Sequence, residues 1–260
     1  MTGLTAAAGQ TGALSRMAVV AGGACDTGLA AALQLAELGL DVALIGADVA
    51  VPVEVTERFF AGGRHCLAIR ADLADGRSFA AALGGARSVL GSPSVLVNCV
   101  PLGGPEPLSA EERYADARRS LRALFACCRA VCAHMVRNRW GRIVNIAQPA
   151  VADGAADREW RDGQTVLGGL VGFTRSAALE LAAYGVTANY IAPSSCYPAG
   201  PAHAPAPPPA AAAGGGGTGP SYAAGVAALT GFLISDQASA ITGQGGYLAG
   251  RPAAPSARWE

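Results

Sequence analysis

Residues 17–30 read Met17-Ala18-Val19-Val20-Ala21-Gly22-Gly23-Ala24-Cys25-Asp26-Thr27-Gly28-Leu29-Ala30, and this stretch decides the fold. It starts as an apolar run, breaks into a glycine-rich turn and continues in an Ala- and Leu-rich pattern. An uninterrupted apolar run is typical of a parallel strand covered on both faces. Glycines in the turn that follows allow a phosphate to approach the backbone at a helix N-terminus. The stretch therefore predicts a strand-turn-helix unit suited to a dinucleotide.

The same alternation continues along the chain. Short β-branched runs are separated by long helical patterns, which predicts parallel βαβ units. We expect a single α/β domain over residues 16–250, with a Rossmann-type doubly wound parallel sheet whose ligands bind at the carboxyl ends of the strands. The further strands are predicted at 42–45, 66–70, 95–98, 141–146 and 186–191.

Three segments are predicted to be mobile because they have little apolar surface to bury. They are an N-terminal tail over residues 1–15, a C-terminal tail over 251–260, and the internal stretch Pro198–Pro220, which is rich in Pro, Ala and Gly.

The composition argues against several classes of partner. The chain has 260 residues, 51% of them hydrophobic and 15% charged, with a formal net charge of zero. Zero net charge gives no long-range attraction to nucleic acid or to an anionic membrane. No signal peptide or bilayer-spanning apolar stretch is apparent, so a cytoplasmic location is expected. Seven cysteines without CxxC spacing argue against a disulfide framework or a metal site, and Cys127, Cys128 and Cys132 are expected in the core.

Further segments extend the pattern of the first turn to most of the chain. The sequence resembles the short-chain dehydrogenase/reductases, in particular the 3-oxoacyl-carrier-protein-reductase-like members. The resemblance implies a nicotinamide cofactor, carbonyl reduction and assembly through the two long helices at 110–137 and 165–184. The segments that carry it are residues 71–73, 95–98, 141–146, 169–176 and 241–245.

The resemblance assigns the nucleotide-contacting positions. Gly22 and Gly28 match the outer glycines of the family's first turn, and Asp26 replaces the middle one, where its carboxylate either caps the helix or opposes a pyrophosphate. Asp72 matches the residue that meets the adenine ring, and Asn98 matches the first residue of the family's NNAG segment. NAD(P) binding is left open on these residues. So is the choice between NAD and NADP, because the second strand ends in Gly-Ala-Asp, with Asp48 either recruited to the ribose or simply solvated.

The catalytic positions differ from the family pattern. Aligned on residues 173–176, the chain has Ser120, Gln148, Gly163 and Leu167 where the family has its Asn, Ser, Tyr and Lys. The chain contains no lysine at all, and no tyrosine lies between residues 116 and 183. Family catalysis relies on a phenol whose pKa is lowered by the lysine charge. We therefore predict that none of the family's catalytic groups is retained.

Substitute polar groups are the remaining candidates. The charged stretch Asp153–Asp162 is expected to be a loop where a substrate would enter. It is either a solvated surface loop or a source of new site residues, namely Arg161 and Asp162 acting with Gln148.

Three functions remain open. The chain is a non-catalytic partner subunit of an active reductase paralogue, or a homo-oligomer that uses the same helices. Alternatively it is a repurposed enzyme of secondary metabolism acting on a polyketide-like small molecule, either as an atypical NAD(P)H-dependent ketoreductase with substrate-assisted proton transfer or as a cyclase or dehydratase. The third reading is a nucleotide or small-ligand binding module.

Overall fold

A computed structural model describes residues 17–103, 109–148, 156–193 and 222–248, with seven strands in one parallel sheet. The strand order is β3-β2-β1-β4-β5-β6-β7, so the chain winds outward from β1 in one direction and from β4 in the other. This is the doubly wound α/β fold that the alternating pattern predicted. The strands are β1 (Met17–Ala21), β2 (Asp41–Gly46), β3 (Cys66–Arg70), β4 (Pro93–Pro101), β5 (Gly141–Gln148), β6 (Val186–Pro193) and β7 (Gly245–Leu248).

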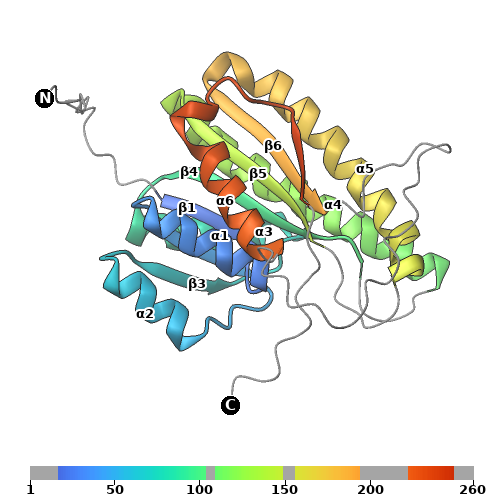
Figure 1. The fold of residues 1–260 in the computed structure, drawn as a ribbon, viewed down its shortest axis with the longest axis horizontal. Helices are drawn as coiled ribbons and strands as arrows, with labels where there is room; N and C mark the ends of the chain where they lie inside the picture. Colours follow the sequence, from blue (N-terminus) through green and yellow to red (C-terminus); the bar gives the residue numbers. More distant parts are fainter. Residues whose placement is uncertain (1–16, 104–108, 149–155, 194–221, 249–260) are drawn as a thin grey trace, which may run out of the picture.

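Helices cover both faces of the sheet (Figure 1). One face carries α1 (Asp26–Glu37), α2 (Val53–Ala61) and α6 (Tyr222–Ile234); the other carries α3 (Gly76–Leu90), α4 (Ala110–Asn138) and α5 (Ala156–Leu181). Two short 3₁₀ turns complete the described elements, at Ala182–Tyr184 and Asp236–Ala238.

The strand β1 explains why there are two cores. Side chains alternate between the faces of a strand, so Met17 and Val19 join the core under α3, α4 and α5, while Ala18 and Val20 join the core under α1, α2 and α6. All four are completely buried. A continuous apolar strand is thus required by helices on both faces.

The structure corrects two of the expectations from the sequence, one about a strand and one about a loop. Strand β7 was not predicted, because its Gly-Gly-Tyr-Leu sequence lacks a β-branched run. The expected charged loop Asp153–Asp162 is wrong from Ala156 onward, where the chain is already in α5. The predicted tails and the predicted mobile stretch Pro198–Pro220 lie outside the described residues.

One helix corrects the expectation that no apolar stretch is long enough for a bilayer. Within the described residues, the helical segment Gly163–Tyr184 is long and apolar enough to cross a bilayer, with a mean hydropathy of 1.3. However, this segment packs on β6 and α4, buries Leu170 and Thr174 fully, and carries the exposed Arg175 and Glu180. These features are typical of a core helix of a sheet protein.

Candidate functional site

A cavity of about 570 Å³ opens at the carboxyl ends of β1 and β4. These neighbouring strands lead in opposite directions through the sheet, and a doubly wound fold binds its ligands at such a switch point. Most of the cavity wall comes from the strand ends and from α4. Its lining includes Gly22, Asp48, Asp72, Asn98, Cys99, Asp116, Arg119, Ser120, Cys127 and Gln148.

The turn after β1 has the close approaches that a phosphate cradle needs. Gly22 has φ +74°, and a Cβ there would lie 2.8 Å from the carbonyl oxygen of Cys99. A Cβ on Gly28 would lie 2.5 Å from both Cα and O of Gly23. Any side chain at these positions would push the turn away from β4 or from the first turn of α1. Both glycines predicted from the sequence therefore have a structural reason, and the backbone geometry fits a pyrophosphate at the helix N-terminus.

The residue that caps α1 is not the one expected. Cys25 occupies the N-cap position, with extended backbone angles, and Asp26 is the first helical residue. The interpretation of Asp26 as the cap is therefore wrong. Its exposed carboxylate still interacts favourably with the positive end of the helix.

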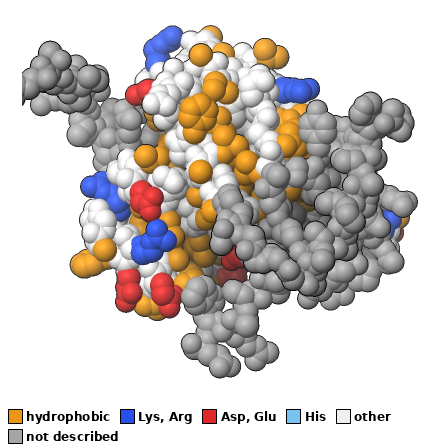
Figure 2. All heavy atoms as spheres, in the orientation of Figure 1, with side chains coloured by type: hydrophobic (Ala, Val, Ile, Leu, Met, Phe, Trp, Pro, Cys, Tyr) orange, Lys and Arg blue, Asp and Glu red, His pale blue; other side chains and the backbone are white. Residues whose placement is uncertain are grey.

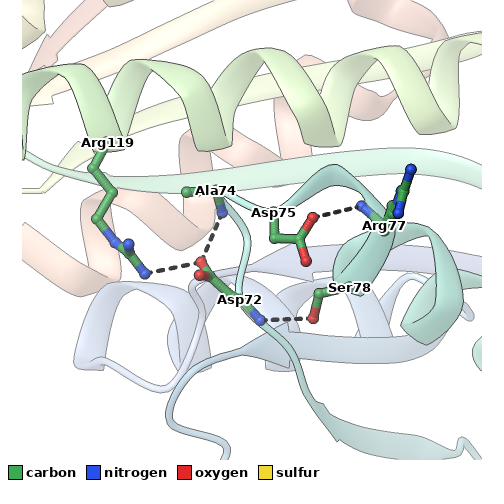
Figure 3. A network of polar contacts seen from close by, with 6 residues as sticks. All are labelled: Asp72, Ala74, Asp75, Arg77, Ser78 and Arg119. Atoms are coloured by element: carbon green, nitrogen blue, oxygen red, sulfur yellow. Dashed lines mark hydrogen bonds and ion pairs between the residues drawn. The ribbon is translucent and has the colours of Figure 1, made fainter.

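Asp72 anchors a polar network after β3 (Figure 3). Its Oδ1 accepts hydrogen bonds from the backbone N–H of Ala74 at 3.0 Å and from the guanidinium of Arg119 at 2.9 Å. The hydroxyl of Ser78 lies 3.0 Å from the Asp72 N–H, which fixes the loop against α3. The carboxylate is thereby held at the wall of the cavity, in the position expected of an adenine contact.

The end of β2 contributes a carboxylate but no cation. Asp48 lines the cavity, and its Oδ1 accepts a hydrogen bond from the N–H of Ala50 at 3.0 Å. Asp48 is thus both a local turn residue and part of the cavity wall, so the two readings of it are compatible.

Asn98 lies at the back of the cavity in a buried polar chain. Its Nδ2 donates to Oδ1 of Asn145 at 2.8 Å, and Nδ2 of Asn145 donates to the hydroxyl of Thr174 at 2.9 Å. Thr174 in turn donates to the carbonyl of Leu170 at 2.7 Å. These bonds join β4, β5 and α5, so the first role of Asn98 is to hold the sheet edge together.

Gln148, which the sequence aligns with the family's serine, faces the nucleotide turn. Its side-chain amide oxygen lies 3.0 Å from Sγ of Cys25, which also lies 3.4 Å from the hydroxyl of Thr27. Hydrogen bonding by the Cys99 thiol lowers the pKa of Cys25 to about 6, with Thr27, the Gly28 backbone and Gln148 acting in the same direction and burial opposing them. Gln148 therefore belongs with a thiol that sequence reasoning did not consider.

Gly163 and Leu167, which the sequence predicts to stand at the positions of the family's phenol and ammonium, are both closely packed. Gly163 is buried, and a Cβ there would lie 3.1 Å from Cβ and 3.2 Å from O of Leu102. Leu167 is 3% exposed and belongs to the core between the sheet and α5. Ser120 is also buried, on the wall that α4 contributes. Among these positions only Ser120 offers a hydroxyl to the cavity.

The substitute residues Arg161 and Asp162 lie in the first turns of α5, and their side chains fall outside what the structure describes. No group of three or more metal-binding side chains occurs within the described residues. Cys127 and Cys128 are buried as expected. The residues that sequence reasoning missed are Cys25, Cys99 and Arg119. The sole sequence signal for the first was a cysteine inside the glycine turn.

The chain is similar to several known proteins. Residues 16–200 match the family model for short chain dehydrogenases. The chain belongs to the short-chain dehydrogenase family. Its relatives include the short-chain dehydrogenase/reductase family member NovK of Streptomyces niveus, 45% identical over 94% of this chain and 99% of that protein.

Two further relatives of this family carry enzyme names. The (2S)-[(R)-hydroxy(phenyl)methyl]succinyl-CoA dehydrogenase subunit BbsD of Thauera aromatica is 31% identical over 70% of this chain and 73% of its own length. The 3-oxoacyl-[acyl-carrier-protein] reductase FabG of Pseudomonas aeruginosa is 30% identical over 88% and 93%. The crystal structure of YwfH, an NADPH-dependent reductase involved in bacilysin biosynthesis, has the same fold, with a TM-score of 0.69 at 24% identity over 90% of this chain and 97% of that one.

Proposed function

We propose that this member of the short-chain dehydrogenase family is a non-catalytic partner subunit of an active reductase. The observation that carries the proposal is the contact between Leu102 and Gly163, together with the buried Leu167. A side chain at 163 would require Leu102 to shift, because its Cβ would lie 3.1 Å from Cβ of Leu102, and the chain has no lysine to lower a phenol's pKa. A positioned general acid contributes roughly 10²–10⁴-fold in rate, so its loss leaves carbonyl reduction near background.

Exposed apolar side chains on α4 and α5 support a partner surface. Phe125 is 55% exposed and meets Phe173 of α5 edge to face, with ring centroids 6.0 Å apart. Tyr114 and Leu179 are 70% and 84% exposed. The partly exposed pair of Phe125 and Phe173 is the part of these helices that best suits a protein–protein contact.

A second apolar region lies over α6, where orange side chains gather in Figure 2. The exposed positions of that helix are Ala224, Ala228 and Phe232, four residues apart and therefore on one side of it. Two apolar regions on different helices suit a subunit with more than one neighbour. The relative BbsD is named as a subunit of a dehydrogenase, which agrees with this role for a chain of the family.

Two glycines of α5 supply a matched test of the partner surface. A Cβ on Gly172 would meet nothing within 4 Å among the described residues, whereas a Cβ on Gly169 would lie 2.6 Å from Leu121 of α4. We expect Gly172→Leu to preserve the circular dichroism spectrum and to weaken assembly by about 1–3 kcal/mol per overpacked contact. Gly169→Leu is expected to destabilise the chain itself. Light scattering measures the difference between the variants. It is applied to each chain alone and to the material that co-purifies with a co-expressed active reductase of the same organism.

Two outcomes would overturn the partner-subunit proposal. One is a wild-type chain that stays monomeric both alone and with the co-expressed reductase. The other is turnover of 3-oxoacyl thioesters above about 1 s⁻¹, an ordinary enzyme rate, by the chain alone. The second outcome would favour the repurposed biosynthetic enzyme.

The glycine turn supports a second element of the proposal, which is that the subunit still binds a dinucleotide. Gly22 and Gly28 would hold the pyrophosphate, and Asp72 would meet the adenine. A nicotinamide cofactor bound there supplies hydride chemistry in the family. We further propose a preference for NAD, because Asp48, Asp72 and Asp116 line the cavity against the single guanidinium of Arg119. That lining opposes a 2′-phosphate.

A further inference from the structure

Two thiols from distant parts of the chain meet beside the nucleotide turn. Cys25 is the N-cap of α1, and Cys99 lies on β4. Because side chains alternate along a strand, Val95, Val97 and Cys99 all join the core beneath α1. The side chain of Cys25 packs against the same core, and its Sγ lies 3.7 Å from the carbonyl oxygen of Gly22. A Cβ built on Gly22 would lie 3.7 Å from Cβ of Cys99, so both cysteines border the same turn residue, and each thiol shifts the pKa of the other. The strand alternation thus aims Cys99 at the first turn of α1.

The surroundings make the two thiols unequal. Sγ of Cys25 is within reach of polar groups of Gln148, Thr27 and Gly22, whereas Cys99 is completely enclosed apart from its side towards the cavity. The hydrogen bond between the thiols lowers the pKa of Cys25 and raises that of Cys99 well above its usual value. Cys25 is therefore the thiol of the pair that favours the thiolate, and Cys99 is the one that keeps its proton.

The other described cysteines lack these features. Burial raises the pKa of Cys66 and Cys132 to about 11, that of Cys127 to about 12, and that of Cys128 well above its usual value. They remain protonated thiols at neutral pH. Since the thiolate is the nucleophile, they react slowly even where a reagent reaches them.

We propose that Cys25 and Cys99 form a redox-active dithiol, which a hydroperoxide converts into an intramolecular disulfide beside the nucleotide turn. The cavity provides the route for the peroxide, because Cys99, Gln148 and Gly22 all line it. Sγ of Cys25 attacks one peroxide oxygen, the O–O bond breaks, and the other oxygen leaves as an alcohol or water after taking a proton. Cys25 is then a sulfenic acid.

The second step closes the disulfide. Cys99 gives up its proton, and its sulfur attacks Sγ of Cys25, which breaks the S–O bond and releases water. In total two thiols lose two electrons and one peroxide is reduced to an alcohol and water. Closing the disulfide requires the Cys25 side chain to leave its contacts with Gln148 and Thr27.

The absence of lysine makes this proposal easy to test by mass spectrometry. Trypsin cleaves this chain only after arginine, so Cys25 falls alone in peptide 17–58, Cys99 alone in 88–113, Cys66 alone in 65–70 and Cys132 alone in 130–137. The reduced full-length protein is treated with a few equivalents of hydrogen peroxide, quenched with N-ethylmaleimide and digested. The expected product is peptide 17–58 linked to peptide 88–113, with a loss of two hydrogens.

Single substitutions separate the two steps. Cys99→Ser should leave a Cys25 sulfenic acid that dimedone traps, because the serine hydroxyl still donates to the thiolate. Cys25→Ser should abolish the linked peptide and leave Cys99 unoxidised. Cys127→Ser is the matched control: it removes a thiol from the wall of the same cavity and should not change the yield of the linked peptide.

The rates give an independent readout. At pH 7 we expect alkylation of Cys25 to be at least about tenfold faster than that of Cys66 or Cys132, since its larger thiolate fraction outweighs its lower intrinsic nucleophilicity. Oxidation of another cysteine before Cys25, over-oxidation of Cys25 without a link to Cys99, or a link between two chains in place of the internal one would each overturn the proposal.

Discussion

The turn after β1 and the start of the described part of α5 border the same edge of the sheet, and each has a glycine at a crowded position. At Gly22 a Cβ would lie 2.8 Å from the carbonyl oxygen of Cys99; at Gly163 it would lie 3.1 Å from Cβ and 3.2 Å from the carbonyl oxygen of Leu102. The first contact is made by backbone, follows from the pairing of β1 with β4 and accompanies the fold. The second depends in part on the residue at 102, because a glycine there would remove the nearest atom. Of these two crowded glycines, only Gly163 can therefore be relieved by one substitution elsewhere.

The largest effect is expected when the family's Ser, Tyr and Lys are restored at the three aligned positions. We expect the triple variant Gln148→Ser, Gly163→Tyr and Leu167→Lys to remain inactive and to lose about 1–3 kcal/mol of stability, because the new phenol overpacks against Leu102. Adding Leu102→Gly removes the Cβ that lies nearest to position 163 and should raise carbonyl reduction by roughly 10²–10⁴-fold.

The readout for these variants is steady-state reduction of a 3-oxoacyl thioester with NADH. Leu102→Gly alone is the control and should stay at background. If the triple variant is already fully active, packing at Gly163 is not what keeps it inactive.

The nucleotide turn is tested by two glycine substitutions. Gly22→Ala should cost at least about 1 kcal/mol and abolish nucleotide binding, because φ is positive and the new Cβ meets the carbonyl of Cys99. Gly39→Ala is the matched control. Its φ is +86°, but a Cβ there meets nothing within 4 Å among the described residues. Gly39→Ala should lose a similar amount of stability, because alanine is strained at a positive φ, and it should keep nucleotide binding.

Urea titration and isothermal titration with NADH measure these two effects. Equal loss of nucleotide binding in both glycine variants would contradict a cradle at Gly22, because only this position lies at the cavity.

The two regions also differ in their response to pH. The Cys25 thiol loses its proton near pH 6 in the folded protein, mainly because Cys99 donates to it, whereas an unfolded cysteine has a pKa of about 9. The unfolded chain then binds the extra proton between these values, so this pair adds stability as pH rises from 6 to 9. Above 9 the trend reverses, because Cys99 and the other buried thiols keep protons that the unfolded chain releases.

Urea unfolding at several pH values, under reducing conditions, checks this sign. In Cys25→Ser the rise between pH 6 and 9 should be much smaller, while the fall above 9 should remain. A wild-type curve that is flat from 6 to 9 and matches that of the variant would contradict a thiolate at Cys25.

The smallest expected effect concerns the choice of nucleotide. We expect NADH to bind more tightly than NADPH, and Arg119→Ala to widen the gap by removing the one cation found among the described residues of the cavity lining. The change should stay within about 1 kcal/mol, because Arg119 and Asp72 are 62% and 44% exposed and water screens the pair. Isothermal titration with both nucleotides measures it, with Arg129→Ala, an exposed arginine of α4 outside the lining, as control. Tighter binding of NADPH would reverse the proposed preference.

The sequence by itself determined the sheet, the glycine turn and the missing lysine. Apolar strand runs such as Met17–Ala21 report burial on both faces, and Gly22 and Gly28 mark positions where backbone atoms leave no room for a side chain. These signals are local, because each depends on a short stretch of chain, so they can be read without knowing the fold.

Only the tertiary structure decided which side chains meet across the cavity. The contacts of Cys25 with Cys99 and Gln148 join residues far apart in the chain, and so does the ion pair of Arg119 with Asp72. The closing of Gly163 by Leu102 is of the same kind. No periodicity reports such pairs, because their distances follow from strand order and from helix placement over the sheet. The sequence could therefore predict where a nucleotide would lie. The thiol pair and the close packing of Gly163 against Leu102 appear only once β4, β5, α1 and α5 are packed together.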